Sequence, residues 1–147
     1  MKVISLDDTP GFWVYRAHTQ GSNLFRKMLQ TAGYDLTPEQ CGVLMRLREC
    51  QGMNQSQLGR RLLKDRHNIT RLLDLLGARG FVERRADEAD KRIYRIFLTE
   101  AGWDLVGKLA PLVDDYFGHM LEGLTDEDVS VMRKTLGRII GNLERSA

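Results

Sequence analysis

A row of hydrogen-bonding and cationic side chains occupies residues 66–71, near the middle of the 147-residue chain. The row consists of Arg66, His67, Asn68, Thr70 and Arg71. Arginine and asparagine pair bidentately with the edges of guanine and adenine, and arginine also binds phosphate. The row therefore predicts contacts with the bases or adjacent phosphates of a nucleic acid. We expect Arg71 to contact a guanine.

Two short helical segments position this row. Asn54 and Gln57 have the spacing of a capping box, and Asp65 is a suitable cap for a second helix. Apolar residues recur at offsets of three and four along the second segment, so that face must pack against a core: Ile69, Leu72, Leu73 and Leu76. Two helices joined by a tight turn form a helix-turn-helix, whose second helix enters the major groove of DNA. Gln55 and Ser56, at the start of the first helix, are expected to contact phosphates.

A β-hairpin is predicted directly after the second helix. Residues 81–85 form its first strand, and residues 93–98 alternate in the period-two pattern of a partner strand. The charged segment ADEADKR between them should lie in solvent. A charged hairpin after such a helix is a wing, on which Arg84, Arg85 and Lys91 are expected to contact phosphates. The predicted fold is mainly α with this small β-hairpin, a winged helix-turn-helix.

At these residues the sequence resembles the MarR family of winged-helix regulators, the multiple antibiotic resistance type. The matching positions are Asp87, Asp90, Lys91, Arg92, Leu98, Thr99 and Gly102. The resemblance implies that Arg92 enters the minor groove and that Asp90 orients it. Lys91 stands where arginine is more common, which should weaken only a phosphate contact. The resemblance extends to the flanking helices and so spans nearly the whole chain.

The distribution of charge supports a nucleic-acid partner better than the net charge does. The whole chain carries only +2, but residues 54–95 contain eleven Lys or Arg against six Asp or Glu. The remaining residues contain eleven basic and fourteen acidic side chains. Basic charge is thus concentrated on the predicted helix-turn-helix and wing, as expected for a surface that binds phosphates.

Long apolar helices flank the predicted DNA-binding lobe, residues 37–99. One covers residues 10–33, and residues 100–147 hold two more. The terminal helices have no further domain to cover, so a second copy of the chain is the simplest partner; the alternative is a last helix that folds back on its own chain. The resemblance also implies that residues 10–33 and 100–147 are the dimerisation helices of a single MarR-like domain, residues 1–147. A two-fold homodimer matches a palindromic operator in double-stranded DNA.

The expected function is sequence-specific transcriptional regulation, as a repressor of an inverted-repeat operator. We expect a small effector to release the repressor. Relatives bind phenolic effectors, and a cavity with aromatic walls and one cation would suit a small aromatic carboxylate. The candidate lining residues are Trp13, Tyr15, Arg16, His18 and Trp103. Their alternative role is that of ordinary core and interface side chains.

Other classes of function have less support in the sequence. Cys41 and Cys50 raise the alternative of a redox-sensing regulator, but they are too far apart along one helix for a disulfide. A winged-helix module that binds protein instead of DNA is a further alternative. The three histidines are scattered, so we expect no metal site, no cofactor and no enzymatic activity. The chain has no membrane-length apolar run or signal-peptide core, so we expect a cytoplasmic protein.

Overall fold

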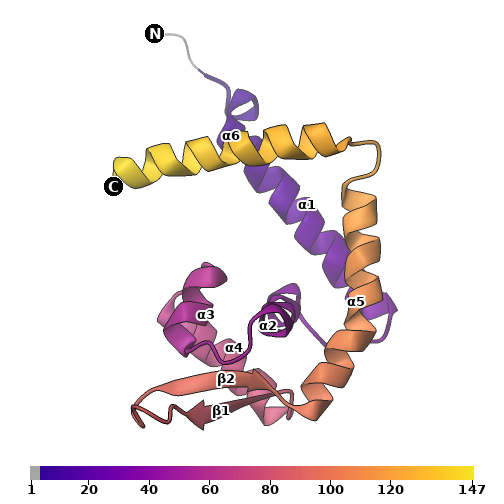
Figure 1. The fold of residues 1–147 in the computed structure, drawn as a ribbon. Helices are drawn as coiled ribbons and strands as arrows, with labels where there is room; N and C mark the ends of the chain where they lie inside the picture. The colour runs from indigo at the N-terminus through magenta and orange to yellow at the C-terminus, as the bar shows by residue number, and fades with distance from the viewer. Residues whose placement is uncertain (1–3) are drawn as a thin grey trace. The chain divides into compact units, whose positions relative to one another are not determined.

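The computed structural model of the protein describes residues 4–147 (Figure 1). Its elements follow the predicted order, mainly helices with one antiparallel hairpin. They are the 3-10 helix η1 (Leu6–Asp8), α1 (Pro10–Thr31), α2 (Pro38–Glu49), α3 (Gln55–Arg61), α4 (Arg66–Ala78), β1 (Val82–Ala86), β2 (Tyr94–Leu98), α5 (Glu100–Met120) and α6 (Asp126–Arg145). The chain forms two compact units, one up to Tyr116 and one from Phe117.

The predicted caps start the helices. The Asn54 side chain accepts from the backbone N–H of Gln57 at 2.9 Å, and the Gln57 side chain accepts from the Asn54 N–H at 3.0 Å. Asp65 accepts from the backbone N–H of Asn68 at 2.8 Å. Thr9, Thr37 and Thr125 likewise cap α1, α2 and α6, because each accepts a backbone N–H three residues on. These starts were predictable because every partner is three residues away in sequence.

The hydrophobic core of the first unit lies among α2, α3, α4 and the hairpin and extends to buried residues of α1 and α5. The predicted apolar face of α4 is buried, and so is one face of α2: Val43, Leu44, Leu47, Ile69, Leu72, Leu73 and Leu76. Figure 1 shows α2, α3 and α4 gathered beside the hairpin. Burial of one face of α4 leaves its opposite face, and its N-terminal end, free for a partner.

The hairpin is attached to the helices at its root. β1 and β2 pair antiparallel, with Val82 opposite Leu98. The Ile96 N–H donates to the Met53 carbonyl at 2.9 Å, and the Gly52 N–H donates to the Ile96 carbonyl at 2.9 Å. The segment that precedes α3 therefore adds backbone hydrogen bonds to β2, which fixes the hairpin relative to the helix-turn-helix.

Several helix ends differ from the predictions. α1 ends at Thr31, with Gly33 beyond it at a φ of +84°. α2 ends at Glu49, because Cys50 already has extended backbone angles. Leu63, in the turn between α3 and α4, has a φ of +53°, a left-handed conformation that no feature of the sequence indicated.

The last two helices are long and partly apolar on the outside. α5 continues through Pro111, and the Thr99 hydroxyl caps it by accepting from the Gly102 N–H at 3.0 Å. Every residue of α6 is at least partly exposed, including Val131, Ile140 and Leu143. None of the helices in the described residues combines the length and apolar character needed to cross a bilayer.

Candidate nucleic-acid interface

The helix-turn-helix is formed by α3 and α4, as predicted. Four residues turn the chain between them, and Asp65 ends this turn as the N-cap of α4. A hydrogen bond between the predicted contact residues Gln55 and Thr70 joins the two helices. Arg66, His67 and Arg71 lie exposed on α4. The first turn of α4 therefore presents the side chains of Arg66 and His67 to solvent.

Two of the predicted base-contacting residues are already engaged within the protein. The Thr70 hydroxyl donates to the Arg66 carbonyl at 2.7 Å and accepts from the Gln55 amide. The Asn68 amide donates to Asp65 at 3.0 Å. Thr70 thus holds α3 against α4, and Asn68 completes the cap. In this conformation, direct contact of Thr70 with a base is the part of the prediction that the structure does not support.

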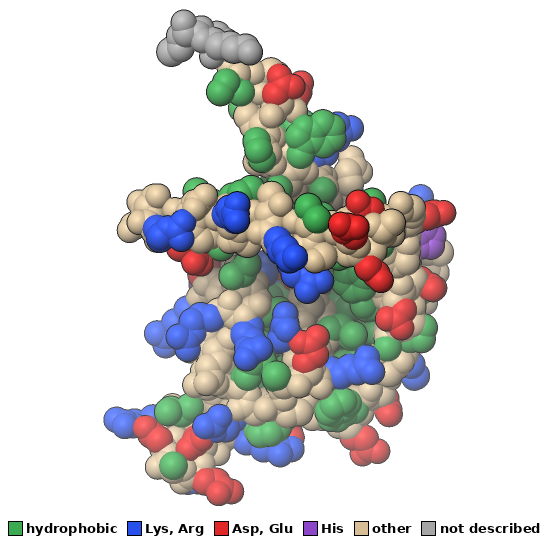
Figure 2. All heavy atoms as spheres, turned by 45° about the horizontal axis from the view of Figure 1, so that its top comes forward, with side chains coloured by type: hydrophobic (Ala, Val, Ile, Leu, Met, Phe, Trp, Pro, Cys, Tyr) green, Lys and Arg blue, Asp and Glu red, His purple; other side chains and the backbone are tan. Residues whose placement is uncertain are grey.

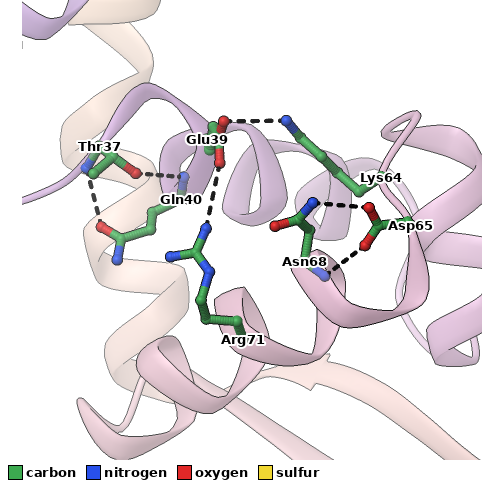
Figure 3. Close-up of polar contacts among 7 residues, drawn as sticks. All are labelled: Thr37, Glu39, Gln40, Lys64, Asp65, Asn68 and Arg71. Carbon is green, nitrogen blue, oxygen red and sulfur yellow. Dashed lines mark hydrogen bonds and ion pairs between the residues drawn. The ribbon is translucent and has the colours of Figure 1, made fainter.

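Arg71 is exposed, but an acidic side chain from another helix lies beside it. Its Nη2 atom is 3.9 Å from a carboxylate oxygen of Glu39, in the first turn of α2. The other oxygen of Glu39 accepts from Lys64 Nζ at 3.2 Å. Figure 3 shows Glu39 between the two cations. Sequence spacing does not indicate a role for Glu39 or Lys64, because their pairing depends on how α2 packs on the helix-turn-helix.

At the wing tip, Asp90 and Arg92 form a two-bonded ion pair. Arg92 Nε donates to one carboxylate oxygen at 3.0 Å, and Nη2 donates to the other at 2.9 Å. This hydrogen bond lowers the pKa of Asp90 and raises that of Arg92. The Arg92 side chain is nevertheless 89% exposed. Asp90 thus orients an arginine that projects into solvent, the arrangement that the resemblance implied.

Asp87 fixes the base of the same loop. Only 13% of its side chain is exposed, and it accepts from the backbone N–H groups of Ala89 and Asp90 at 2.9 and 3.0 Å. It also accepts from Arg95, which in turn donates to the Gly52 carbonyl at 2.9 Å. The hydrogen bond from Arg95 is the main cause that lowers the pKa of Asp87. The loop that carries Arg92 is thereby connected to the segment before α3.

Arg84 and Arg85 lie on opposite faces of the hairpin, because successive strand residues alternate. Arg84 is opposite the buried Ile96 in the register and donates to Asp74 of α4 at 2.8 Å. The Arg85 guanidinium lies 4.4 Å from the centre of the Phe97 ring and pairs with Glu83. The two arginines therefore face different sides of the hairpin, and their contacts with phosphates stay a prediction.

A groove of about 600 Å³ lies between the helix-turn-helix and the wing. Its lining includes four predicted contact residues, Gln55, Ser56, Arg66 and Arg92. It also includes three residues that were not predicted as contacts: Arg60, Lys64 and Tyr94. All four charged side chains of the lining are basic. Figure 2 shows Lys and Arg side chains on the hairpin at the lower left, mixed there with Asp and Glu, and on the surface above it. Such a groove suits a polyanion.

Comparisons with known proteins agree with this geometry. The MarR family model matches residues 34–93, which include α2, the helix-turn-helix, β1 and the loop before β2. The transcriptional regulator TtmR of Methylorubrum extorquens (strain PA1) is 35% identical over 92% of this chain, which spans 66% of that protein's length. A probable transcriptional regulator from Pseudomonas aeruginosa is 30% identical, with a TM-score of 0.81 over 92% of this chain and 99% of that one.

The chain belongs to the MarR family. A structure of a mutant MarR from Escherichia coli, complexed with operator DNA, is also similar to it. That protein is 26% identical, with a TM-score of 0.79 over 88% of this chain and 91% of the other. The family and the winged-helix fold that the sequence predicted are therefore confirmed.

In this MarR-family chain, the five candidate effector residues do not form one cavity within a single subunit. The rings of Phe25 and Tyr116 lie 4.9 Å apart, where α1 packs against α5. Trp13 and Trp103 each lie roughly 20 Å along their helices from this contact. Figure 1 shows that the two helices start on opposite sides of this contact, α1 above it and α5 below it. Sequence spacing could not show this, since it depends on the relative direction of the two helices.

The candidate residues of α1 lie on its exposed surface. The Trp13 indole N–H donates to the Asp7 carbonyl at 2.7 Å, and the Arg16 guanidinium lies 5.5 Å from the centre of the Trp13 ring. Trp13 is 55% exposed and Tyr15 is 68% exposed. His18 is also exposed. An aromatic ring and a cation therefore lie together on α1, without an enclosing wall from α5 of the same chain.

The two cysteines differ in environment. Cys41 is 1% exposed, and burial raises the pKa of its thiol to about 11. A thiol with that pKa is protonated at neutral pH, and the thiolate is the reactive form. Cys50, at the end of α2, is half-buried. The environment of Cys41 therefore opposes the redox-sensing alternative at that residue and agrees with a core thiol.

Proposed function

We propose that this MarR-family regulator is a repressor that binds double-stranded DNA as a homodimer at an inverted-repeat operator. The observation that carries the proposal is the basic groove between the helix-turn-helix and the wing, with Arg92 projecting from its edge. A duplex placed against this groove would have phosphates near four cations. The proposal is supported by the similarity to a MarR protein complexed with operator DNA.

Each part of the surface has a distinct proposed role. The N-terminal part of α4 enters the major groove, where Arg66, His67 and Arg71 contact bases or adjacent phosphates. Gln55 and Ser56 lie in the first turn of α3, where side chains and free backbone N–H groups bind phosphate. Arg92 enters the minor groove, whose narrow A·T segments concentrate negative potential. Lys91 is exposed beside it and neutralises phosphate.

The proposed dimer would use the terminal helices. Apolar side chains on α1 and α6 are exposed, among them Val14 at 48%, Ile140 at 54% and Leu143 at 66%. Exposed apolar side chains of this number favour a protein partner. A two-fold dimer presents two copies of α4, which would match half-sites with centres about 10 bp apart or a multiple of this.

We further propose that a small aromatic effector releases the repressor from DNA. An aromatic carboxylate would find the Trp13 ring and the Arg16 cation together on α1, and a partner subunit would have to supply the remaining wall. Binding that favours one spacing of the two α4 helices would shift the dimer away from the spacing that DNA requires. Such a regulator would act in the cytoplasm and would not be an enzyme.

Arg92→Ala tests the role of the wing. Its expected effect is at least about tenfold weaker binding to the DNA upstream of its own gene, because a close arginine contact in a groove is worth roughly 1–3 kcal/mol. Binding is measured by fluorescence anisotropy at two salt concentrations, and the molecular mass of the dimer by light scattering. Arg26→Ala, which removes an exposed arginine from α1, is the matched control. Equal affinities of the two variants would exclude the wing from the interface.

Salt dependence tests the DNA-binding function itself. Binding through phosphates releases counterions, so affinity should fall steeply as salt rises, with a logarithmic slope of about −0.9 for each phosphate contacted. A wild-type affinity that is independent of salt would contradict the proposed function.

A further inference from the structure

We infer that Glu39 is a specificity-determining residue. It restrains Lys64 and Arg71 and thereby weakens their binding to the phosphates of DNA of arbitrary sequence. This inference rests on the proposed DNA-binding function. Glu39 lies outside the helix-turn-helix, in the first turn of α2. Its carboxylate is nevertheless paired with one cation from the turn before α4 and one from α4 itself.

The contacts of Glu39 divide between its two oxygens. Oε1 accepts a hydrogen bond from Lys64 Nζ at 3.2 Å, and Oε2 lies 3.9 Å from Arg71 Nη2 (Figure 3). Glu39 lies 25 residues before Lys64 in sequence, and Arg71 follows on the next helix. The partial positive charge at the N-terminus of α2 favours a carboxylate at this position.

Both cations are accessible to a DNA phosphate, and Glu39 is exposed beside them. Glu39 and Arg71 are 49% and 52% exposed, and Lys64 is 30% exposed. Lys64 also lines the basic groove, together with Arg66. A phosphate that enters the groove must therefore compete with Glu39 for Lys64.

The geometry leaves Arg71 able to contact a base. A guanidinium has five N–H donors, and Glu39 is near only one of its nitrogens, Nη2. The remaining donors can pair with the O6 and N7 atoms of guanine while Glu39 still limits the rotamers of the arginine. When Lys64 or Arg71 binds a phosphate of an arbitrary sequence instead, the restraint contributes no base contact, and the ion pair with Glu39 is lost.

These differences predict opposite effects on two kinds of binding. Non-specific binding depends almost entirely on phosphate neutralisation, so Glu39 should weaken it. Operator binding also depends on aligned base contacts, so it should be affected less. Glu39 therefore increases the ratio of operator affinity to non-specific affinity.

Glu39→Gln tests the inference in the full-length protein, because glutamine keeps the size of the side chain and removes its charge. Two 30-bp duplexes are compared, one enriched from a random library by the wild-type protein and one a scrambled sequence of the same composition. Glu49→Gln is the matched control, since Glu49 lies at the other end of α2 and pairs with Arg46 at 2.6 Å. Thermal unfolding checks that each variant is folded.

The expected result is about threefold to tenfold tighter binding of Glu39→Gln to the scrambled duplex, which is the range for loss of two exposed ion pairs. Its salt slope should become more negative by about 1 for each phosphate newly neutralised. Its affinity for the selected duplex should change by less than about twofold, so that discrimination falls. Glu49→Gln should leave discrimination unchanged.

The outcomes separate this inference from the function on which it rests. If wild-type protein binds neither duplex in a salt-dependent way, the proposed function and the inference both fail. If wild-type protein discriminates between the duplexes, and Glu39→Gln discriminates equally well or changes only as Glu49→Gln does, the inference alone is overturned.

Discussion

Gly102→Ala should destabilise the protein, although alanine normally stabilises a helix. Gly102 is buried in the first turn of α5. A Cβ atom at this position would lie 2.1 Å from the Phe81 carbonyl oxygen and 3.2 Å from the side chain of Leu98. The same carbonyl accepts the Thr99 N–H at 3.1 Å. Because the obstacle is backbone, no change of rotamer can make room, and the start of α5 or the root of the wing must move.

Two opposing effects set the size of the loss. Replacing glycine by alanine inside a helix gains up to about 1 kcal/mol. Overpacking a buried site costs about 1–3 kcal/mol, and more where the backbone must shift. A contact as close as 2.1 Å places Gly102 at the upper end of this range. We therefore expect a net loss of about 2 kcal/mol in the free energy of unfolding, or roughly 4–8 °C in Tm.

Gly107→Ala provides the control on the same helix. A Cβ atom at Gly107 would have no other atom within 4 Å apart from its own helix backbone, so this variant should gain up to about 1 kcal/mol. Urea unfolding followed by circular dichroism measures both changes. If the two variants shift the midpoint in the same direction by similar amounts, the expected clash at Gly102 is refuted, and with it the close packing of α5 on the wing root.

Three further predictions concern the turn, the cysteines and the wing. Leu63→Gly should stabilise the fold by up to about 1 kcal/mol in urea unfolding, since a left-handed leucine is strained and its side chain is 92% exposed; a lower midpoint would contradict this. A thiol reagent at pH 8 should modify Cys50 in the native protein but Cys41 only after denaturation, because burial raises the Cys41 pKa to about 11; two thiols reacting at once would refute it. Because Arg95 lowers the pKa of Asp87, the ionised side chain stabilises the fold above the ordinary aspartate pKa, and this contribution is lost as pH falls through the lowered value. Asp87→Asn should therefore reduce stability more at pH 7 than at pH 3, and an equal loss at both would count against the Arg95 contact.

The parts of the structure that depend on short sequence distances were predictable. The capping pair of Asn54 and Gln57 and the cap of α4 at Asp65 involve partners three residues apart. The ion pair of Asp90 and Arg92 involves partners two residues apart. Local geometry alone brings such groups together, and the same is true of the buried apolar face of α4.

The parts that depend on packing between helices were not predictable from spacing. The contact of Glu39 with Arg71 joins α2 to α4, and nothing near either residue in sequence indicates the other. The separation of Trp13 from Trp103 likewise follows from the relative direction of two helices. Arg84 and Arg85 are a different case, because strand alternation already implied that consecutive residues point to opposite faces.

Acidic side chains accompany the cations of the proposed DNA surface, and this pairing explains how a chain with a net charge of only +2 can present such a surface. Asp90 contacts the Nε and Nη2 atoms of Arg92, which leaves Nη1 on the far side. Glu39 lies near one nitrogen of Arg71. An arginine restrained in this way loses less side-chain entropy when it binds in its preset direction, but it must break an ion pair to follow a phosphate elsewhere. The acids therefore lower the total affinity for DNA while they favour the sequence that fits the preset arginines. Removal of either acid should increase binding to arbitrary duplexes more than binding to the operator.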